Sequence, residues 1–139
     1  MKLDIGCGKT VAKGHVGLDI KDFGQRLVFD VRDGGIPQGP WEEIRAAHFI
    51  EHLTQEEAIN FLNDCWEVCD KLYLVVPHKE SENSWILTHK TFYTEATFRH
   101  LERDGIRKSY GISNWKINKM VTNSRHDIHV WMEPDEQKS

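Results

Sequence analysis

The alternation of apolar and polar positions divides the chain first into short predicted strands. The apolar runs, each bounded by glycines, prolines or charged residues, lie at residues 2–5, 15–20, 26–30, 43–47 and 72–76. The last run is apolar throughout, as a strand buried on both faces requires, and Pro77 is expected to end it. The first two connections are too short for the helical crossover that parallel strands usually need, so we expect loops there.

Helical periodicity first appears at Thr54, which forms a capping-box pattern with Glu57. A core-facing stripe at helical spacing then follows at Ala58, Phe61, Leu62, Cys65 and Cys69. A second helix is expected at residues 95–103, ended by Asp104 and Gly105. Residues 115–117 and 128–132 alternate around a turn, which predicts an antiparallel hairpin. We therefore expect one domain over residues 1–132 and a flexible tail at 133–139.

The stretch from Asp4 to Gly8 carries the most specific chemistry of the chain, because it leads a strand into Gly-x-Gly. Glycines permit a tight turn and let a ligand approach the backbone. Asp19 ends the next predicted strand, where its carboxylate can accept both hydroxyls of a ribose. This combination predicts a nucleoside-binding site.

Two phosphate-binding motifs do not match this sequence, because their residues would have to be spaced differently. The dinucleotide fingerprint needs a third glycine where Val11 stands, and an acid about 20 residues further on, well beyond Asp19. The phosphate loop needs a glycine where Leu3 stands, and a lysine that opens a helix. A glycine turn in an ordinary βα unit remains the structural alternative.

The segment Asp4-Ile5-Gly6-Cys7-Gly8, followed by Asp19, resembles motif I and the next acidic strand end of class I S-adenosylmethionine-dependent methyltransferases. Residues 43–53 and 89–94 look like stretches of small-molecule and glycan methyltransferases. The resemblance covers about residues 2–132. Thr10 replaces a frequent third glycine, the N-terminal helix is absent, and the first two crossovers are loops.

The resemblance implies an α/β fold with a Rossmann-like sheet, mostly parallel and closed by the C-terminal antiparallel hairpin. It implies an enzyme that uses S-adenosylmethionine to methylate an unidentified acceptor, with a small molecule or glycan favoured. The alternative is a non-catalytic S-adenosylmethionine-binding or assembly module. The residues implied to bind the cofactor, with Asp30 at the adenine amino group and Val31 at the ring, are Asp4, Gly6, Cys7, Gly8, Asp19, Ile20, Asp30, Val31 and His48.

The segment His48-Phe49-Ile50-Glu51-His52 also matches the H-x-x-E-H pattern of zinc hydrolases. That chemistry needs both histidines on one helical face, whereas the helical signal begins only at Thr54. We therefore expect no metal site, and interpret Glu51 and His52 as a hydrogen-bonded pair before the helix. His48, His52 and His78 follow the fourth and fifth strands and are candidate general bases, although loop-holding hydrogen bonds are the simpler explanation for each.

Composition indicates which partners and which cellular compartment to expect. A chain of 139 residues with 18 basic and 22 acidic side chains lacks the basic balance of nonspecific nucleic-acid binding, and no apolar run approaches the roughly 20 residues of a membrane span. Three cysteines without a disulfide pattern, and a start without a signal peptide, predict a cytoplasmic protein. Because strands one to three lack crossover helices, we expect a homodimer or a partner chain over the open sheet face.

Overall fold

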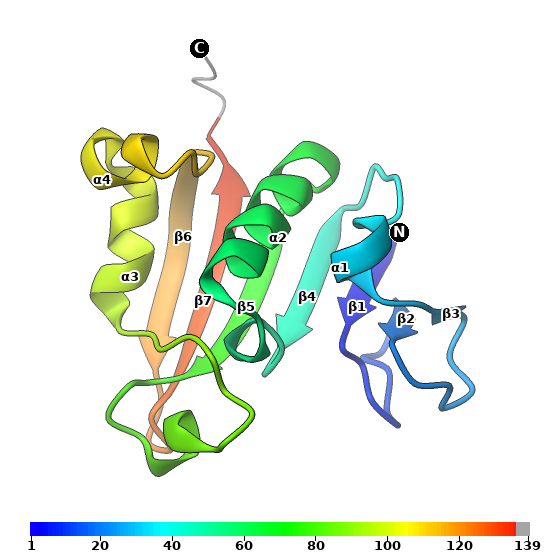
Figure 1. The fold of residues 1–139 in the computed structure, drawn as a ribbon. Coiled ribbons are helices and arrows are strands. Elements are labelled where there is room, and N and C mark those ends of the chain that lie inside the picture. Colours follow the sequence, from blue (N-terminus) through cyan, green and yellow to red (C-terminus); the bar gives the residue numbers. More distant parts are fainter. Residues whose placement is uncertain (136–139) are drawn as a thin grey trace.

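The computed structural model describes residues 1–135, and in that part of the chain seven strands form one sheet. The strands are β1 (Lys2–Ile5), β2 (His15–Asp19), β3 (Leu27–Val28), β4 (Glu43–Ala47), β5 (Leu72–Pro77), β6 (Trp115–Thr122) and β7 (Asp127–Pro134). Their order across the sheet is β3-β2-β1-β4-β5-β7-β6 (Figure 1). Strands β1 to β5 run parallel, and β7 runs antiparallel to β5 and β6. The expected α/β sheet with its antiparallel hairpin is therefore confirmed.

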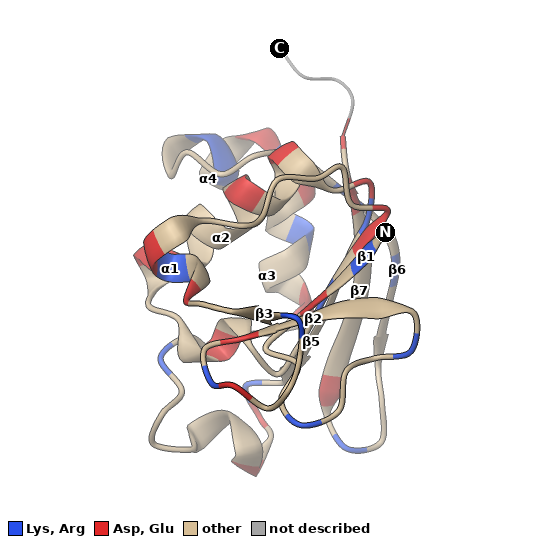
Figure 2. Cartoon of the chain, turned by 90° about the vertical axis from the view of Figure 1, so that its right-hand side faces the viewer, with Lys and Arg blue, Asp and Glu red and all other residues tan. Residues whose placement is uncertain are grey.

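The α-helices all lie on one side of this sheet (Figures 1 and 2). The helical segments are α1 (Val31–Gly34), α2 (Gln55–Val68), α3 (Glu95–Arg99) and α4 (Asp104–Ser109), with 3-10 turns η1 (Ile50–His52), η2 (Glu82–Trp85) and η3 (His100–Glu102). Right-handed crossovers explain the asymmetry. The connections from β1 to β2 and from β2 to β3 advance along the sheet in the opposite direction to the later ones, so their helices would cover the other face. Those two connections are loops.

Helix α2 begins where its sequence predicts. The Glu57 N–H donates to Thr54 Oγ1 at 3.2 Å, and the Thr54 N–H donates to Glu57 Oε1 at 2.9 Å, so the capping box is confirmed. The predicted stripe is buried, at Ala58, Phe61, Leu62, Cys65 and the capping residue Cys69. Each large apolar side chain buried in this way contributes roughly 1.5–3 kcal/mol. The stripe therefore fixes α2 on the sheet.

Strand register sorts the sheet residues into two faces of different character. Leu3, Ile44, Leu72 and Met132 are aligned across four strands and are fully buried in the core. The next row on these strands is Asp4, Arg45, Tyr73 and Trp131, which faces the helix-free side. On that face the Tyr73 and Trp131 rings stack at 4.8 Å, and the Arg45 guanidinium lies 5.3 Å from the centre of the Tyr73 ring. The open face is thus aromatic and charged rather than aliphatic.

Pro77 ends the fifth strand as expected. It is the last residue of β5, one residue beyond the predicted run of 72–76, and pairs with Asp127 of β7. The neighbouring strand explains why the proline can be included. Pairing between β4 and β5 ends at Ala47 and Val75, so the missing N–H of Pro77 leaves no β4 partner unsatisfied.

The helical segment expected at residues 95–103 is present as α3 followed directly by η3, but its expected termination by Asp104 and Gly105 was wrong. Arg103 has extended backbone angles (φ −111°, ψ 141°), which separate η3 from α4. Asp104 begins α4 instead of ending the earlier helix, and its carboxylate accepts a 2.7 Å hydrogen bond from Arg107 Nη2.

Other differences concern element ends. Strand β3 is shorter than the predicted 26–30, and the short helix α1 was not predicted. Strand β7 continues through Glu133 and Pro134, two residues of the tail expected at 133–139. Residues 136–139 lie outside the described residues. No helix in the described part of the chain is both long enough and apolar enough to cross a membrane.

Candidate functional site

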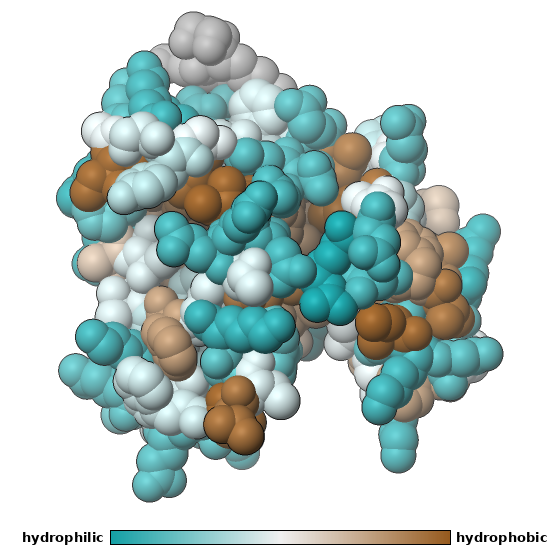
Figure 3. Space-filling view, viewed as in Figure 1, coloured by the Kyte–Doolittle hydropathy of each residue, from teal (hydrophilic) through white to brown (hydrophobic). Residues whose placement is uncertain are grey.

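The candidate site lies at the carboxyl edge of the parallel strands, the lower edge in Figure 1. Open α/β sheets bind their ligands at this edge. In the space-filling view, the same edge is hollowed between the segments that follow β1 to β3 and those that follow β4 and β5 (Figure 3). The loops around this hollow carry most of the residues that the sequence predicts to bind a cofactor.

The glycine turn after β1 has the backbone conformation for which glycine is required. Gly6 and Gly8 have φ values of 69° and 62°, in the left-handed region that other residues rarely adopt. The N–H groups of Gly6 and Cys7 both donate to Leu18 O, at 2.8 and 3.2 Å. A Cβ on Gly6 would lie 3.0 Å from Phe49 Cδ1. The turn is therefore held against β2 and packs closely against the segment that follows β4.

Two carboxylates hold the loops on either side of this turn. Asp19 Oδ2 accepts the Gly8 N–H at 2.9 Å, and its Oδ1 accepts the Lys21 N–H at 3.2 Å. Asp4 is buried, and its Oδ2 accepts the Ala12 N–H at 2.9 Å. An ionised carboxylate offers about four acceptor positions, so Asp19 can bind further donors.

Cys7 lies between these two acids. Partial burial of the thiol, together with the carboxylates of Asp4 and Asp19, raises the pKa of Cys7 above its ordinary value. The structure therefore brings Asp4, Gly6, Cys7, Gly8 and Asp19 together at one turn, whereas the neighbouring Ile20 is 57% exposed.

Asp30 caps the short helix α1 and binds the arginine two residues later. Its Oδ1 accepts the Arg32 N–H at 2.9 Å, and its Oδ2 accepts Arg32 Nη2 at 2.6 Å. The hydrogen bonds from the Arg32 guanidinium lower the pKa of Asp30. A donor from a ligand would therefore meet a carboxylate that is ionised and already oriented.

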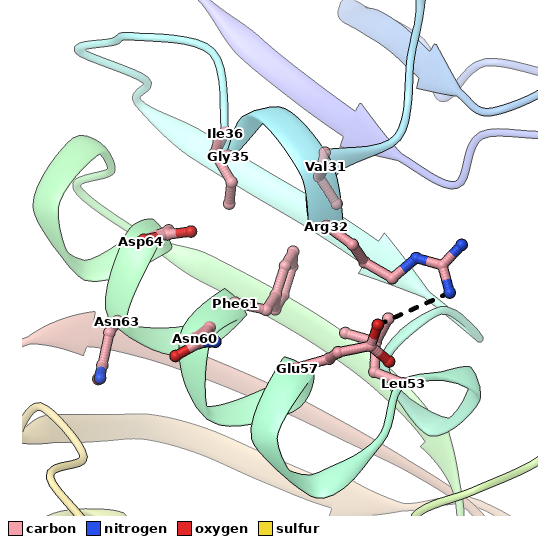
Figure 4. Close-up of a pocket in the computed structure, with 10 residues that line it drawn as sticks. All are labelled: Val31, Arg32, Gly35, Ile36, Leu53, Glu57, Asn60, Phe61, Asn63 and Asp64. Atoms are coloured by element: carbon pink, nitrogen blue, oxygen red, sulfur yellow. Dashed lines mark ion pairs between the residues drawn. The ribbon is translucent and has the colours of Figure 1, made fainter.

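A cavity of about 230 Å³ lies between α1 and α2 (Figure 4). Val31 and Phe61 line it, and Arg32 Nη1 lies 3.7 Å from Glu57 Oε2 at its rim. Of the nine residues predicted to bind the cofactor, only Val31 lines this cavity. The cavity is therefore lined by α1 and α2 and does not contain the glycine turn.

His48 follows β4 in an unusual conformation, with φ of 54°. Its Nδ1 lies 3.5 Å from Glu51 Oε2, and its Nε2 lies 3.8 Å from Asp127 Oδ2. The contact with Glu51, partly offset by burial, raises the pKa of His48 above its ordinary value. Two carboxylates thus favour the protonated form of the ring.

The other two candidate bases differ in their surroundings. His78 has both ring nitrogens engaged, since Nδ1 accepts the Glu80 N–H at 3.1 Å and Nε2 lies 3.0 Å from Glu95 Oε1. This arrangement favours a loop-holding role for His78. His52 packs edge-on against His89, with ring centres 4.6 Å apart.

The expected hydrogen-bonded pair of Glu51 and His52 was wrong. Glu51 is 1% exposed, and neither carboxylate oxygen accepts a hydrogen bond from the residues that the structure describes. Sequence analysis also missed the approach of His89 to this pair, because His89 lies in a polar loop far along the chain. The only sequence signal was the resemblance of residues 89–94 to glycan methyltransferases.

The sequence itself identifies no relatives, since no protein-family model matches it and no curated protein is significantly similar to it. Solved structures do match its fold. The 1,6-didemethyltoxoflavin-N1-methyltransferase of Burkholderia thailandensis has a TM-score of 0.68 at 10% identity, over 97% of this chain and 71% of that one. The magnesium protoporphyrin IX methyltransferase of Synechocystis PCC 6803 has a TM-score of 0.60 at 15% identity, over 97% and 70%. The chain has the class I methyltransferase fold.

A third match shows how small this methyltransferase fold is. The mitomycin 7-O-methyltransferase MmcR has a TM-score of 0.65 at 11% identity and covers 96% of this chain, which spans only 48% of MmcR. In the present chain, the edge of the methyltransferase fold carries the carboxylates of Asp4, Asp19 and Asp30. Val31 and Phe49 add apolar surface. Such a set suits a ligand that has hydroxyl and amino donors and an aromatic ring.

Proposed function

We propose that this chain binds S-adenosylmethionine at the carboxyl edge of β1 to β4 and transfers its methyl group to a small molecule or glycan. The observation that carries the proposal is the contact between the glycine turn and Asp19, in which Asp19 Oδ2 accepts the Gly8 N–H at 2.9 Å. It places a carboxylate beside bare backbone at the edge where this fold binds ligands. One of the matched structures, the magnesium protoporphyrin IX methyltransferase, contains bound S-adenosylmethionine, which supports the choice of cofactor.

The proposed contacts follow from the chemistry of each side chain. Asp19 accepts the two ribose hydroxyls, and Asp30, oriented by Arg32, accepts the adenine amino group. Val31 lies beside Asp30 and contacts the ring. The turn from Gly6 to Gly8 lets the methionine part approach the backbone where a Cβ would collide.

Methyl transfer does not require a protein side chain to form a covalent bond with the substrate. The bound cofactor supplies a methyl group activated by a sulfonium. The protein holds the acceptor atom in line, at about 3–3.5 Å, and excludes water. No covalent nucleophile is needed. Where the acceptor is a hydroxyl, neither His78 nor His48 is favoured as its base, because His78 has both ring nitrogens engaged and His48 lies between two carboxylates.

The cofactor is tested by calorimetry with S-adenosylhomocysteine, NAD and ATP under the same conditions. We expect binding of S-adenosylhomocysteine at one site per chain, at least about tenfold tighter than either competitor. Equal or tighter binding of NAD or ATP would contradict the proposal. The acceptor class is tested by incubation with radiolabelled cofactor and separate pools of small molecules, glycans and nucleic acids, with label expected in the first or second pool.

The alternative is a binding or assembly module without activity. It is not favoured, because the matched structures described above are named as methyltransferases. The two proposals differ in one result. An enzyme transfers label to an acceptor in an extract, whereas a module binds the cofactor and leaves every pool unlabelled.

We also propose a reduced, cytoplasmic setting and a second chain over the helix-free face. The first is supported by Cys7, Cys65 and Cys69, which are all free thiols. The second is supported by the helix-free face itself, which carries the stacked rings of Tyr73 and Trp131.

A further inference from the structure

Glu51 is a buried carboxylate whose charge the described structure does not balance by hydrogen bonds. Its side chain is 1% exposed, and neither oxygen has a hydrogen-bond partner among residues 1–135. A carboxylate without such partners is costly to bury unless it is paired with a cation or binds a metal. The nearest cationic group is His48, whose Nδ1 lies 3.5 Å from Oε2. That single contact leaves Oε1 unaccounted for.

Two imidazoles lie beside this carboxylate. The possible ligand atoms of Glu51, His52 and His89 all lie within 4.8 Å of one another. His52 and Glu51 come from η1, and His89 comes from the loop after β5. A single ion at the centre of these three groups would be within reach of each after small side-chain rotations.

Backbone hydrogen bonds hold these two segments together. The N–H groups of Lys90 and Thr91 both donate to Glu51 O, at 2.8 and 3.2 Å, and Thr91 Oγ1 donates to Ile50 O at 3.2 Å. His89 is therefore fixed beside η1 by its own neighbours in the chain. The three groups meet because the backbone positions them, independently of any attraction between their side chains.

The hydrogen bonds of His89 also suit a metal ligand. Its Nδ1 lies 3.2 Å from Ser84 O, a carbonyl that can only accept, so Nδ1 carries the proton. Nε2 then carries no proton, and its lone pair can bind a metal ion. Metal-binding histidines typically donate their other ring N–H to a carbonyl or carboxylate in this way, which fixes the ring and its tautomer.

We propose that Glu51, His52 and His89 bind one divalent transition-metal ion. Two imidazoles and one carboxylate suit Zn²⁺, Mn²⁺ or Fe²⁺, rather than Mg²⁺ or Ca²⁺, which prefer oxygen ligands alone. Three protein ligands leave coordination positions open. The site differs from the H-x-x-E-H zinc motif, because the second imidazole is that of His89, and it departs from our expectation of no metal.

Metal binding is measured without the cofactor, so its outcome is independent of the proposed methyl transfer. The protein is dialysed against a chelator and titrated with Mn²⁺ or Zn²⁺ by calorimetry. We expect one ion per chain and a rise in melting temperature. Glu51→Gln and His89→Ala should each weaken binding by at least about 100-fold, more than the loss of an outer hydrogen-bond partner costs.

A matched control is His100→Ala, a half-buried histidine outside the cluster. It should leave the affinity for Mn²⁺ and Zn²⁺ within about twofold of the wild type. Glu51→Gln keeps the shape of the side chain, and removing a buried charge that accepts no hydrogen bond should raise the melting temperature of the metal-free protein while abolishing the rise caused by metal. The proposal is overturned if neither ion binds below about 1 mM, or if binding survives in Glu51→Gln and His89→Ala.

Discussion

Replacing Asp19 by Ala separates the two roles of this carboxylate, which are to hold the loops by hydrogen bonds and to bind the ribose as proposed. The change removes the acceptor of the Gly8 N–H (2.9 Å) and of the Lys21 N–H (3.2 Å). Both bonds lie near the surface, so each contributes about 1 kcal/mol, and the free energy of unfolding should fall by about 2 kcal/mol. The fold should therefore survive. Loss of the proposed bonds to two ribose hydroxyls should cost a further 2–3 kcal/mol of binding, roughly a 30- to 150-fold weaker Kd.

The assay is calorimetry with S-adenosylhomocysteine, well below the melting temperature of the variant. Asp22→Ala is the matched control, because Asp22 Oδ1 accepts the Gly24 N–H at 2.8 Å in the next exposed loop, away from the turn. Asp19→Asn keeps one oxygen that can accept the Gly8 N–H but loses the charge. Its affinity for S-adenosylhomocysteine should therefore lie between that of Asp19→Ala and that of the wild type. The reasoning fails if folded Asp19→Ala binds within about threefold of the wild type, or if Asp22→Ala weakens binding equally.

Three further outcomes are expected. Gly17→Ala should destabilise the chain by about 1–3 kcal/mol in chemical denaturation, because the new Cβ would lie 2.5 Å from Val11 Cγ2; an unchanged midpoint would contradict this. The hydrogen bond from Thr122 (2.6 Å) lowers the pKa of Glu95, so this contact stabilises the fold at neutral pH and is lost as the pH falls below about 4.5; Glu95→Gln should flatten that decline in melting temperature. Light scattering at micromolar concentration should give the mass of two chains, and a single-chain mass would reject the homodimer.

Local patterns predicted the elements that are decided within a few residues. The capping box of Thr54 and Glu57 and the buried stripe of α2 depend only on helical spacing, so the sequence sufficed. The sequence also sufficed to predict the glycine turn beside Asp19. Adjacent parallel strands joined by a short loop must end side by side, which brings Gly8 to Asp19.

The failures arise where a neighbour far along the chain decides the outcome. Even the one extra residue of β5, Pro77, depends on β4, which stops pairing earlier, and nothing near Pro77 in the sequence indicates this. His89 reaches Glu51 through hydrogen bonds made by the two residues after it, across a loop whose path no periodicity describes. The candidate metal cluster could therefore not be predicted from spacing, although its Glu51 and His52 belong to a motif that was recognised.

The helix-free face of the sheet has a consequence for protein engineering. The loop from β2 to β3 is exposed at residues 21–24, and right-handed connectivity directs any longer insertion there onto the unoccupied face. A helix grafted there would lie over β2 and β3 without altering the pairing of β1 with β2 or β4. In this chain two of the four connections between the parallel strands are loops, and the sheet with its single helical layer is a scaffold on which a second layer can be built.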